Sequence, residues 1–212
     1  MIMIGKSEYK ILITTSGIGS RLGELTDYTN KSLIRIGNKP ALSLIIENYP
    51  METEFVITLG HYGKYVKEFL NITYPDRHFT FVGVNNYEGP GSSLGYSILQ
   101  AKEYLQCPFI FNACDTLLSD GAVITEFLKN VSNFCLGSVR KDASQYATLL
   151  VDNKKLKEIK KKGEINFDYA YAGICGIKDY EDFWDTLEET YDQDPGDSTL
   201  HEGRIINKML KK

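Results

Sequence analysis

Residues 10–40 read KILITTSGIGSRLGELTDYTNKSLIRIGNKP, a stretch that joins an apolar run to a glycine-rich loop. The run predicts a buried β-strand, and Gly17 and Gly19 give the loop behind it backbone torsions that other residues avoid. Successive amides in such a loop form an anion-binding concavity, and a guanidinium beside it adds charge-assisted hydrogen bonds to phosphate oxygens. The stretch therefore predicts a phosphate site at the end of a strand, with Arg21 and Lys31 as its cations.

Two well-known phosphate loops do not fit this spacing. In the P-loop pattern a second glycine follows the first by five positions and a lysine comes next, but the chain has Leu22 and Gly23 there. The dinucleotide-binding pattern needs a glycine or alanine at position 22, and about twenty residues later an acidic residue that this chain lacks. Both motifs are excluded.

Strand-like and helix-like segments alternate along the first half of the chain. The patterns there predict strands at 10–15, 55–59, 79–84 and 109–111 and helices at 42–48, 65–70 and 92–105. This alternation is typical of a layered α/β fold with a mostly parallel sheet. Beyond residue 130 we predict strands at 133–139, 146–151, 155–159 and 167–177, a hairpin tip at 152–155, and helices at 183–190 and 200–210.

A carboxylate, Asp115, follows the apolar run at 109–111. In open α/β sheets, ligands collect at the carboxyl ends of the strands, so we expect Asp115 to lie near the glycine loop. Mg²⁺ takes few protein oxygens and keeps water and phosphate oxygens for its other positions, which suits a single carboxylate at this edge. A turn or helix cap is the alternative role for the same aspartate.

Composition narrows the class of protein. The chain has 212 residues, of which 42% are hydrophobic and 25% charged, as in an ordinary globular protein. Its net charge of −4 argues against nucleic acid as a partner, because phosphate-backbone binding usually requires a basic surplus. No apolar stretch is as long as a membrane span, and the apolar start at 1–4 is too short for a secretion signal. We expect a cytoplasmic protein with free thiols and no histidine or cysteine metal site.

The order of the motifs resembles the sugar-phosphate nucleotidyltransferases, also called pyrophosphorylases. That family has a strand, Gly-x-Gly-x-Arg-Leu, a Pro-Lys pair and a Gly-Lys-Pro turn, and the chain matches with Gly17, Gly19, Arg21, Leu22, Lys31 and the turn at 36–40. The resemblance covers about residues 10–177. Thr15 and Ser16 replace two alanines, and Asn30 replaces a proline. The Thr-Ser-Gly start, the compact size and the sequence Gly-Pro-Gly-Ser-Ser at 89–93 look most similar to a compact cytidylyltransferase-like subgroup from bacterial surface-polysaccharide clusters.

The resemblance implies a three-layer Rossmann-like (GT-A-like) domain over 1–212, with a nucleotide-binding part at 1–130 and an acceptor-binding part at 131–212. It implies an enzyme that joins a nucleoside triphosphate to a phosphomonoester, releases pyrophosphate and uses Mg²⁺. The implied sites are catalytic Arg21 and Lys31, nucleotide-binding Thr15, Ser16, Gly17, Gly19, Ser20, Gly91 and Ser92, acceptor-binding Lys162, Tyr171 and Gly173, and metal-binding Asp115.

Several alternatives stay open. CTP is the expected nucleotide, with a UTP- or dTTP-dependent sugar-1-phosphate enzyme and a non-catalytic nucleotide sensor as the other readings. A glycosyltransferase is disfavoured because residues 115–117 lack an Asp-x-Asp motif. Relatives continue into a further strand that carries a second acidic metal ligand. Neither Asp185 nor Asp197 suits that role, so the second ligand and a C-terminal truncation are left open. A homo-oligomer is also left open. Residues 89–92 equally suit a plain helix entry, and Lys162 a solvated charge run.

Overall fold

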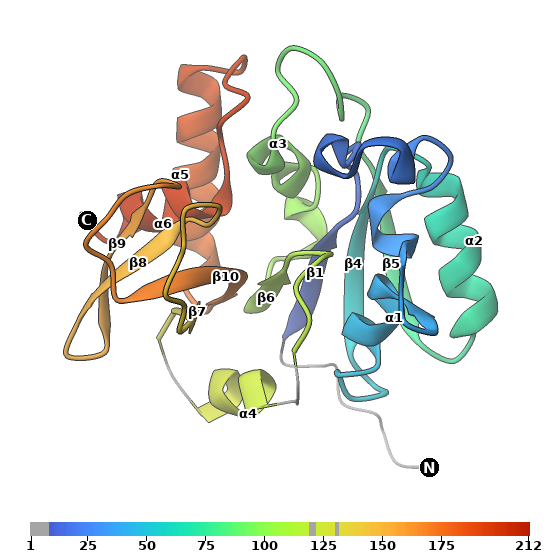
Figure 1. The fold of residues 1–212 in the computed structure, drawn as a ribbon, viewed down its shortest axis with the longest axis horizontal. Coiled ribbons are helices and arrows are strands. Elements are labelled where there is room, and N and C mark those ends of the chain that lie inside the picture. Colours follow the sequence, from blue (N-terminus) through green and yellow to red (C-terminus); the bar gives the residue numbers. More distant parts are fainter. Residues whose placement is uncertain (1–8, 119–121, 130–131) are drawn as a thin grey trace.

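A mixed β-sheet forms the centre of the computed structural model, which describes residues 9–118, 122–129 and 132–212 (Figure 1). The apolar start at 1–4 therefore lies outside the described residues. Within them the sheet has eight strands in the order β5-β4-β1-β6-β10-β8-β9, with β7 also paired to β10. The strands are β1 (Lys10–Thr14), β4 (Glu54–Leu59), β5 (His78–Gly83), β6 (Phe109–Asn112), β7 (Phe134–Ser138), β8 (Thr148–Asp152), β9 (Lys155–Lys160) and β10 (Tyr169–Ile177).

The sheet has a parallel half and an antiparallel half. Strands β5, β4, β1 and β6 run parallel to one another, whereas β10 pairs antiparallel with β6, β7 and β8, and β8 pairs antiparallel with β9. The apolar run on β1 is fully buried, as expected for a strand covered on both faces. The carboxyl ends of β1 and β6 consequently open at the junction of the two halves.

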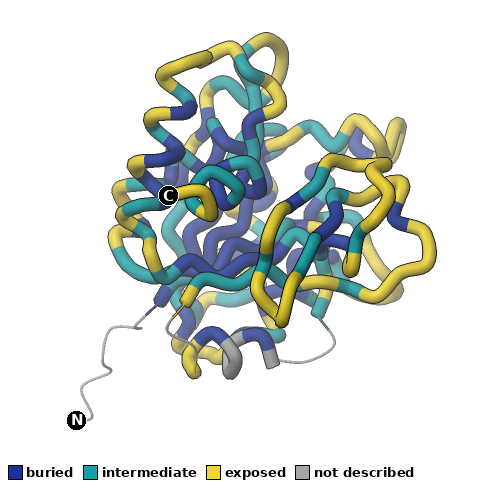
Figure 2. Tube along the Cα trace, turned by 90° about the vertical axis from the view of Figure 1, so that its left-hand side faces the viewer, coloured by how far each residue is buried: buried dark blue, intermediate teal, exposed yellow. Residues whose placement is uncertain are grey.

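Helices cover both faces of this sheet and make it the middle of three layers. They are α1 (Ala41–Ile46), α2 (Gly63–Thr73), α3 (Leu94–Leu99), α4 (Ala122–Lys129), α5 (Tyr180–Gln193) and α6 (Glu202–Met209). Helices α3, α5 and α6 pack with one set of alternate strand residues, and α1, α2 and α4 pack with the other set. The predicted three-layer α/β fold is confirmed, and Figure 2 shows the buried parts of the chain gathered in the interior with exposed parts around them.

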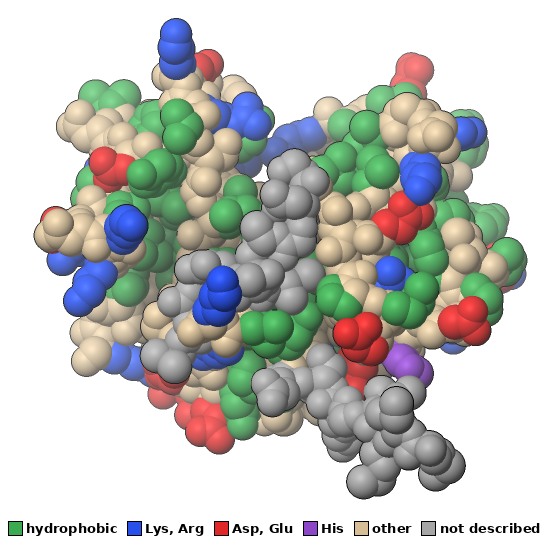
Figure 3. All heavy atoms as spheres, turned by 90° about the horizontal axis from the view of Figure 1, so that it is seen from below, with side chains coloured by type: hydrophobic (Ala, Val, Ile, Leu, Met, Phe, Trp, Pro, Cys, Tyr) green, Lys and Arg blue, Asp and Glu red, His purple; other side chains and the backbone are tan. Residues whose placement is uncertain are grey.

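Short elements complete the fold. These are the 3₁₀ turns η1 (Ser20–Thr26), η2 (Lys31–Leu33) and η3 (Lys102–Tyr104), and the strands β2 (Arg35–Ile36) and β3 (Lys39–Pro40), which pair only with each other. None of the helices within the described residues is long and apolar enough to cross a membrane. Acidic and basic side chains are interspersed on the face in Figure 3, where the described side chains form no basic stripe.

Most predicted elements are present, with three differences. The helix predicted at 92–105 is wrong in extent, because α3 ends at Leu99 and only η3 follows. Its cap is Ser93, whose Oγ accepts the Tyr96 N–H at 2.9 Å, and not Ser92. Helix α4 had no sequence prediction. The hairpin tip is confirmed, since Asn153 and Lys154 both have positive φ in the two-residue turn between β8 and β9.

Candidate active site

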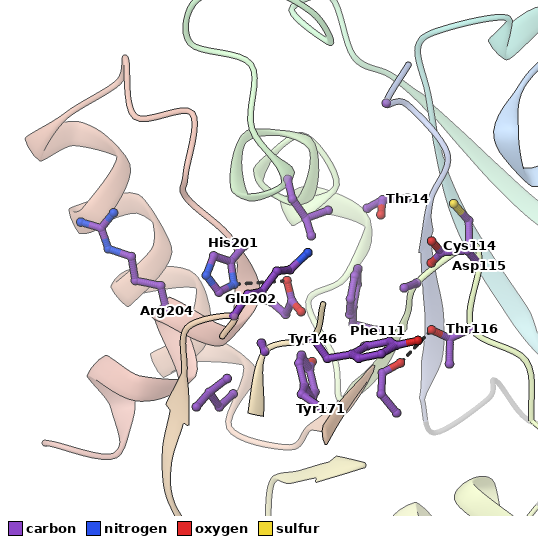
Figure 4. Close-up of a pocket in the computed structure, with 18 of the residues that line it drawn as sticks. Thr14, Phe111, Cys114, Asp115, Thr116, Tyr146, Tyr171, His201, Glu202 and Arg204 are labelled. Atoms are coloured by element: carbon purple, nitrogen blue, oxygen red, sulfur yellow. Dashed lines mark hydrogen bonds and ion pairs between the residues drawn. The ribbon is translucent and has the colours of Figure 1, made fainter. Parts of the chain in front are cut away.

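A cleft of about 1790 Å³ lies at the carboxyl ends of β1 and β6, between the two halves of the sheet. One wall carries the glycine loop, Lys31 and the segment after β6. The other wall comes from β7, β9, β10, the segment before β8 and the start of α6. Figure 4 shows this arrangement, with Asp115 and Cys114 on one side and Tyr146, Tyr171 and Glu202 on the other.

Asn30 fastens the glycine loop to its surroundings. This residue is 1% exposed, and its Nδ2 donates to the carbonyl oxygens of Thr15 at 2.7 Å and His61 at 2.6 Å. Its Oδ1 accepts from the N–H and the hydroxyl of Ser32, so Asn30 caps the N-terminus of η2. Proline, which the related family has at this position, could make none of these side-chain hydrogen bonds. Asn30 therefore holds the loop by hydrogen bonds, an arrangement called here the Asn30 clamp, where proline would give a rigid turn.

The hydroxyls of Thr15 and Ser16, which begin the loop, donate hydrogen bonds within the protein. Thr15 is buried, and both its N–H and its hydroxyl donate to the carbonyl of Thr58, at 3.1 and 2.6 Å. The Ser16 hydroxyl, also buried, donates to the Ser97 hydroxyl at 2.8 Å and so ties the loop to α3. These side chains therefore fix the position of the loop beneath the cleft.

Gly17 and Gly19 differ in their surroundings. Gly19 has φ +72°, and a Cβ there would lie 3.0 Å from Thr26 Cγ2 and 3.1 Å from Lys31 Cβ. A side chain at Gly19 would thus be strained in backbone and crowded by its neighbours. Gly17 has open space around its Cα, because a Cβ there would meet nothing within 4 Å. The loop consequently leaves room for a ligand at Gly17 and holds Lys31 close at Gly19.

Three charged side chains share the cleft next to this loop. Lys31 Nζ lies 2.7 Å from Asp115 Oδ2, and Arg21 lines the same cavity. Burial lowers the pKa of Lys31, but the neighbouring Cys114 and Asp115 outweigh this effect and leave the pKa raised. Lys31 is therefore a cation throughout the physiological pH range, held against a carboxylate that is about half exposed.

The segment that carries Asp115 is tied to β10. The Ala113 N–H donates to the Gly173 carbonyl at 3.0 Å, and the Thr116 hydroxyl donates to the Ala172 carbonyl at 2.7 Å. Gly173 has φ +75°, and a Cβ there would lie 3.2 Å from Ala113 Cβ, so this close approach favours glycine. Asp115 and the opposite wall are thereby fixed relative to each other.

Basic and aromatic side chains line the opposite wall. Lys160, Lys161 and Lys162 follow one another at the cleft, and the Arg140 guanidinium lies 4.6 Å from the centre of the Tyr146 ring. Tyr171 is 8% exposed, and burial raises its pKa well above the ordinary value. Because its side chains are mainly basic and aromatic, this wall suits a ligand that carries a negative charge and polar groups.

The overall geometry matches solved structures with low sequence identity. No protein-family model and no curated protein matches the sequence at a significant level. A UDP-glucose pyrophosphorylase complexed with UDP-glucose superimposes with a TM-score of 0.76, at 17% identity, covering 96% of this chain and 87% of that one. The CTP:phosphocholine cytidylyltransferase of Streptococcus pneumoniae gives 0.73 at 19% identity, covering 96% and 86%. The inositol-1-phosphate CTP transferase of T. maritima gives 0.75 at 16% identity, covering 98% and 82%.

This chain has the fold of the sugar-phosphate nucleotidyltransferases. At these identities the likeness establishes the fold, and the roles of individual residues stay predictions. The nucleotidyltransferase fold brings most of the predicted site residues to one cleft. These are Thr15, Ser16, Gly17, Gly19, Arg21, Lys31, Ser92, Asp115, Lys162, Tyr171 and Gly173.

Two predicted nucleotide-binding residues, Ser20 and Gly91, are not among those that line the cleft. Gly91 has φ +79° and lies in the turn before α3, where the Ser92 hydroxyl donates to the Gly89 carbonyl at 2.7 Å. This bond closes the turn locally. A role in nucleotide binding for Ser20 and Gly91 would thus need the loops to move within the nucleotidyltransferase fold.

Asn30 and Glu202 lie in the cleft but were not predicted as site residues. Asn30 looked like a departure from the family pattern, and only its contacts show that it clamps the loop. Glu202 was not singled out in the sequence, because acidic residues are common in the first turn of a helix. Its 5% exposure and its position in the cleft depend on the packing of α6 against α5 and β9, which no local pattern in the sequence encodes.

The donor set near Asp115 fits Mg²⁺ only together with substrate. Within residues 9–118, 122–129 and 132–212, no group of three or more His, Cys, Asp or Glu side chains gathers to hold a metal. Mg²⁺ in nucleotide sites commonly takes one or two carboxylates and completes its shell with phosphate and water oxygens. The half-exposed Asp115 carboxylate beside the glycine loop fits such a shared site.

Proposed function

We propose that this protein is a nucleotidyltransferase that joins a nucleoside triphosphate to a phosphomonoester and releases pyrophosphate. The observation that carries the proposal is the convergence of Arg21, Lys31 and Asp115 beside an open glycine at the carboxyl edge of the sheet. Ligands bind at this edge in open α/β sheets. The site suits an anion of the size of a triphosphate, because Arg21 and Lys31 lie on one wall of the cleft and the lysines at 160–162 lie on the opposite wall.

The proposed chemistry depends on alignment and on neutralisation of charge. An oxygen of the acceptor phosphate attacks the α-phosphorus, the bond to the β-phosphate oxygen breaks, and pyrophosphate leaves. Arg21 would bind the departing pyrophosphate with its planar fork, and Lys31 would follow the reacting phosphate as a point charge. Asp115 would hold Mg²⁺ with phosphate oxygens, and this ion would supply further neutralisation of negative charge. No covalent intermediate on the protein is needed.

The ion pair between Lys31 and Asp115 adds a step to substrate entry. A triphosphate at the loop competes with Asp115 for the Lys31 ammonium, and a metal competes with Lys31 for the carboxylate. Binding nucleotide and metal together satisfies both groups at once, whereas either alone leaves one of them without its partner. We therefore expect the nucleotide to bind more tightly in the presence of Mg²⁺.

We propose CTP as the nucleotide and a sugar phosphate or small polar phosphate as the acceptor. Two of the similar structures named above are described as CTP-dependent transferases and one as a UDP-glucose enzyme. A UTP- or dTTP-dependent sugar-1-phosphate nucleotidyltransferase is the alternative. The product would be an activated precursor for surface polysaccharide, made in the cytoplasm.

A screen of pyrophosphate release tests this function. The wild-type protein is incubated with Mg²⁺, each of CTP, UTP, dTTP and ATP, and a panel of phosphomonoesters, and pyrophosphate is measured by a coupled assay. Release that requires both substrates supports the transferase, and the best triphosphate identifies the nucleotide. Absence of release with every pair, while calorimetry shows intact nucleotide binding, would contradict the proposal and favour a nucleotide sensor.

A further inference from the structure

Near the start of helix α3 lies a glycine, Gly95, against which the side chain of Leu200 packs. A Cβ on Gly95 would lie 2.3 Å from Leu200 Cγ and 2.8 Å from Leu200 Cδ2, which is too close for any side chain at this position. The Gly95 N–H donates to the Leu200 carbonyl at 2.8 Å. Both residues are buried, and Leu200 is 2% exposed. This contact therefore depends on the absence of a side chain at position 95.

The place of Gly95 in the helix agrees with such a role. Glycine is a poor helix former, so other residues would suit α3 better on propensity alone. Ser93 caps the helix through its Oγ, which accepts the Tyr96 N–H, and the Gly95 N–H is one of the first amides that have no acceptor inside a helix. The Leu200 carbonyl supplies that acceptor. Gly95 thus provides both a donor for the Leu200 backbone and room for the Leu200 side chain, and alanine would keep only the donor.

Helix α3 connects the glycine loop to the opposite wall of the cleft. The Ser16 hydroxyl donates to the Ser97 hydroxyl at 2.8 Å, which fixes the loop to α3. Leu200 precedes α6, whose first residue is Glu202. Ser97 and Leu200 both line the cleft, and Figure 1 shows α3 between α5 and the strands of the parallel half. A chain of contacts consequently runs from the glycine loop through α3 to the start of α6.

The segment that carries Leu200 is joined to α6 by its own polar contacts. Asp197 Oδ1 accepts from the Thr199 N–H at 2.8 Å and from the Thr199 hydroxyl at 2.6 Å. The other oxygen of the Asp197 carboxylate pairs with the Arg204 guanidinium of α6. A displacement of Leu200 would therefore carry the start of α6 with it.

We propose that Gly95 and Leu200 are positioning residues, which set the distance between the glycine loop and the start of α6 and so align the nucleoside triphosphate with the acceptor phosphate. The inference rests on the proposed function, because it assumes that the two substrates bind on these two walls. Transfer between two bound substrates depends on alignment, and a misplacement of about 1 Å can cost on the order of 10²-fold in rate. Neither residue has to touch a substrate in this role. The pair should consequently affect kcat more than it affects the binding of either substrate.

Three variants of the full chain test the pair. Gly95→Ala places a Cβ against the Leu200 side chain and should push α6 away from α3. Leu200→Ala keeps the backbone hydrogen bond and removes the side chain. The double variant removes the two atoms nearest to the new Cβ and leaves Leu200 Cβ, at 3.1 Å, as its neighbour. Pyrophosphate release with the best substrate pair gives kcat, and calorimetry without Mg²⁺ gives the dissociation constants of CTP and of the acceptor.

We expect each single variant to lower kcat about 10- to 100-fold, with both dissociation constants within threefold of the wild type. The double variant should recover at least fivefold in kcat over Gly95→Ala, because the substitution at one residue relieves the crowding at the other. A folded Gly95→Ala with kcat within threefold of the wild type would overturn the inference. A double variant that regains the wild-type melting temperature without regaining kcat would show a merely structural contact and also overturn it.

A matched control separates crowding in general from crowding at this contact. Gly63 is a buried glycine at the start of α2, where a Cβ would lie 2.8 Å from Leu59 Cβ, and it is not among the described residues that line the cleft. Gly63→Ala should lower the melting temperature and keep kcat within twofold of the wild type. A kcat loss in Gly63→Ala as large as that in Gly95→Ala would contradict the inference.

The outcomes also keep this inference apart from the proposed function. Where Gly95→Ala does not fold, Leu200→Ala decides alone, and wild-type kcat in the folded Leu200→Ala would overturn the inference. Normal release in the folded single variants would overturn the positioning role and leave the transferase standing. No release by the wild type with any substrate pair would overturn the proposed function and this inference with it.

Discussion

The ammonium of Lys31 lies 2.7 Å from Oδ2 of Asp115, across 84 residues of sequence. The pair joins the loop after β1 to the loop after β6, whose strands are parallel neighbours in the sheet. It holds the two groups that the proposed reaction needs most, a phosphate-binding cation and a metal-binding carboxylate, in mutual contact. Substrate and metal can separate them only by offering each a better partner.

Removal of the carboxylate should abolish turnover with little effect on stability. Because Asp115 is about half exposed, its ion pair with Lys31 is screened by water and contributes less than about 1 kcal/mol. We expect Asp115→Asn to lower kcat about 10²- to 10³-fold while the melting temperature changes by no more than a few degrees. Steady-state kinetics and a thermal melt measure the two quantities. A variant that kept wild-type kcat would remove Asp115 from the proposed chemistry.

Metal removal should act on the nucleotide as well as on turnover. With EDTA in place of Mg²⁺, Lys31 stays paired with Asp115. The triphosphate then loses its contacts with the metal ion and part of its attraction to the Lys31 ammonium. We expect no pyrophosphate release and a CTP affinity at least several-fold lower by calorimetry. In Asp115→Asn the same comparison should show a smaller effect of the metal. An equal effect in the variant and the wild type would place the metal elsewhere.

Asn30 should matter for stability before it matters for catalysis. Its side chain donates to the buried Thr15 carbonyl and the partly buried His61 carbonyl and caps η2, and Asn30→Ala leaves these groups unpaired. We expect a loss of about 2–4 kcal/mol, which corresponds to a melting temperature roughly 5–10 °C lower for a protein of this size. The exposed Asn38→Ala is the control and should melt like the wild type. A shift of less than 2 °C in Asn30→Ala would contradict the proposed clamp.

The two loop glycines should separate stability from binding. Gly19→Ala adds a Cβ at positive φ within 3.0 Å of Thr26 Cγ2, so the variant should be destabilised by about 1–3 kcal/mol. Gly17→Ala adds a Cβ into open space, so it should melt like the wild type and bind CTP more weakly. Thermal melts and calorimetry on both variants decide the matter. Intact CTP affinity in Gly17→Ala would show that the ligand does not approach Gly17.

Glu202 should give stability a dependence on pH. Burial raises its pKa above the ordinary value of 4.5, so the folded protein keeps the Glu202 proton at pH values where the unfolded chain has lost it. Stability from this group therefore falls as pH rises above about 4.5. Glu202→Gln should be more stable than the wild type at pH 7, and the difference should shrink toward pH 4. Denaturant titrations at both pH values test this, and a difference that grew toward pH 4 would have the wrong sign.

The sequence predicted the sheet better than it predicted the site. Long apolar runs such as Ile11–Ile13 and Phe109–Phe111 mark buried strands by themselves, which is why the three-layer fold could be predicted. Lys31 was predicted from its place in the order of the motifs after the glycine loop. Asp115 was predicted from its position after the buried strand at 109–111, which ends at the same edge of the sheet. Glu202 could not be found this way, because its burial arises from the packing of α6 against α5 and β9. The end of α3 was missed because no glycine or proline marks it.

Pyrophosphate release by the wild type and by Arg21→Ala, Lys31→Ala and Asp115→Ala is the most direct measurement of the proposed reaction. With the best substrate pair and Mg²⁺, the wild type should turn over, and each variant should lose roughly 10²- to 10³-fold in kcat. Lys64→Ala, at an exposed position on α2 whose one ion pair within the described residues is with Glu68, should retain wild-type turnover. Near-normal release by all three cleft variants would show that this cleft is not the site of nucleotidyl transfer.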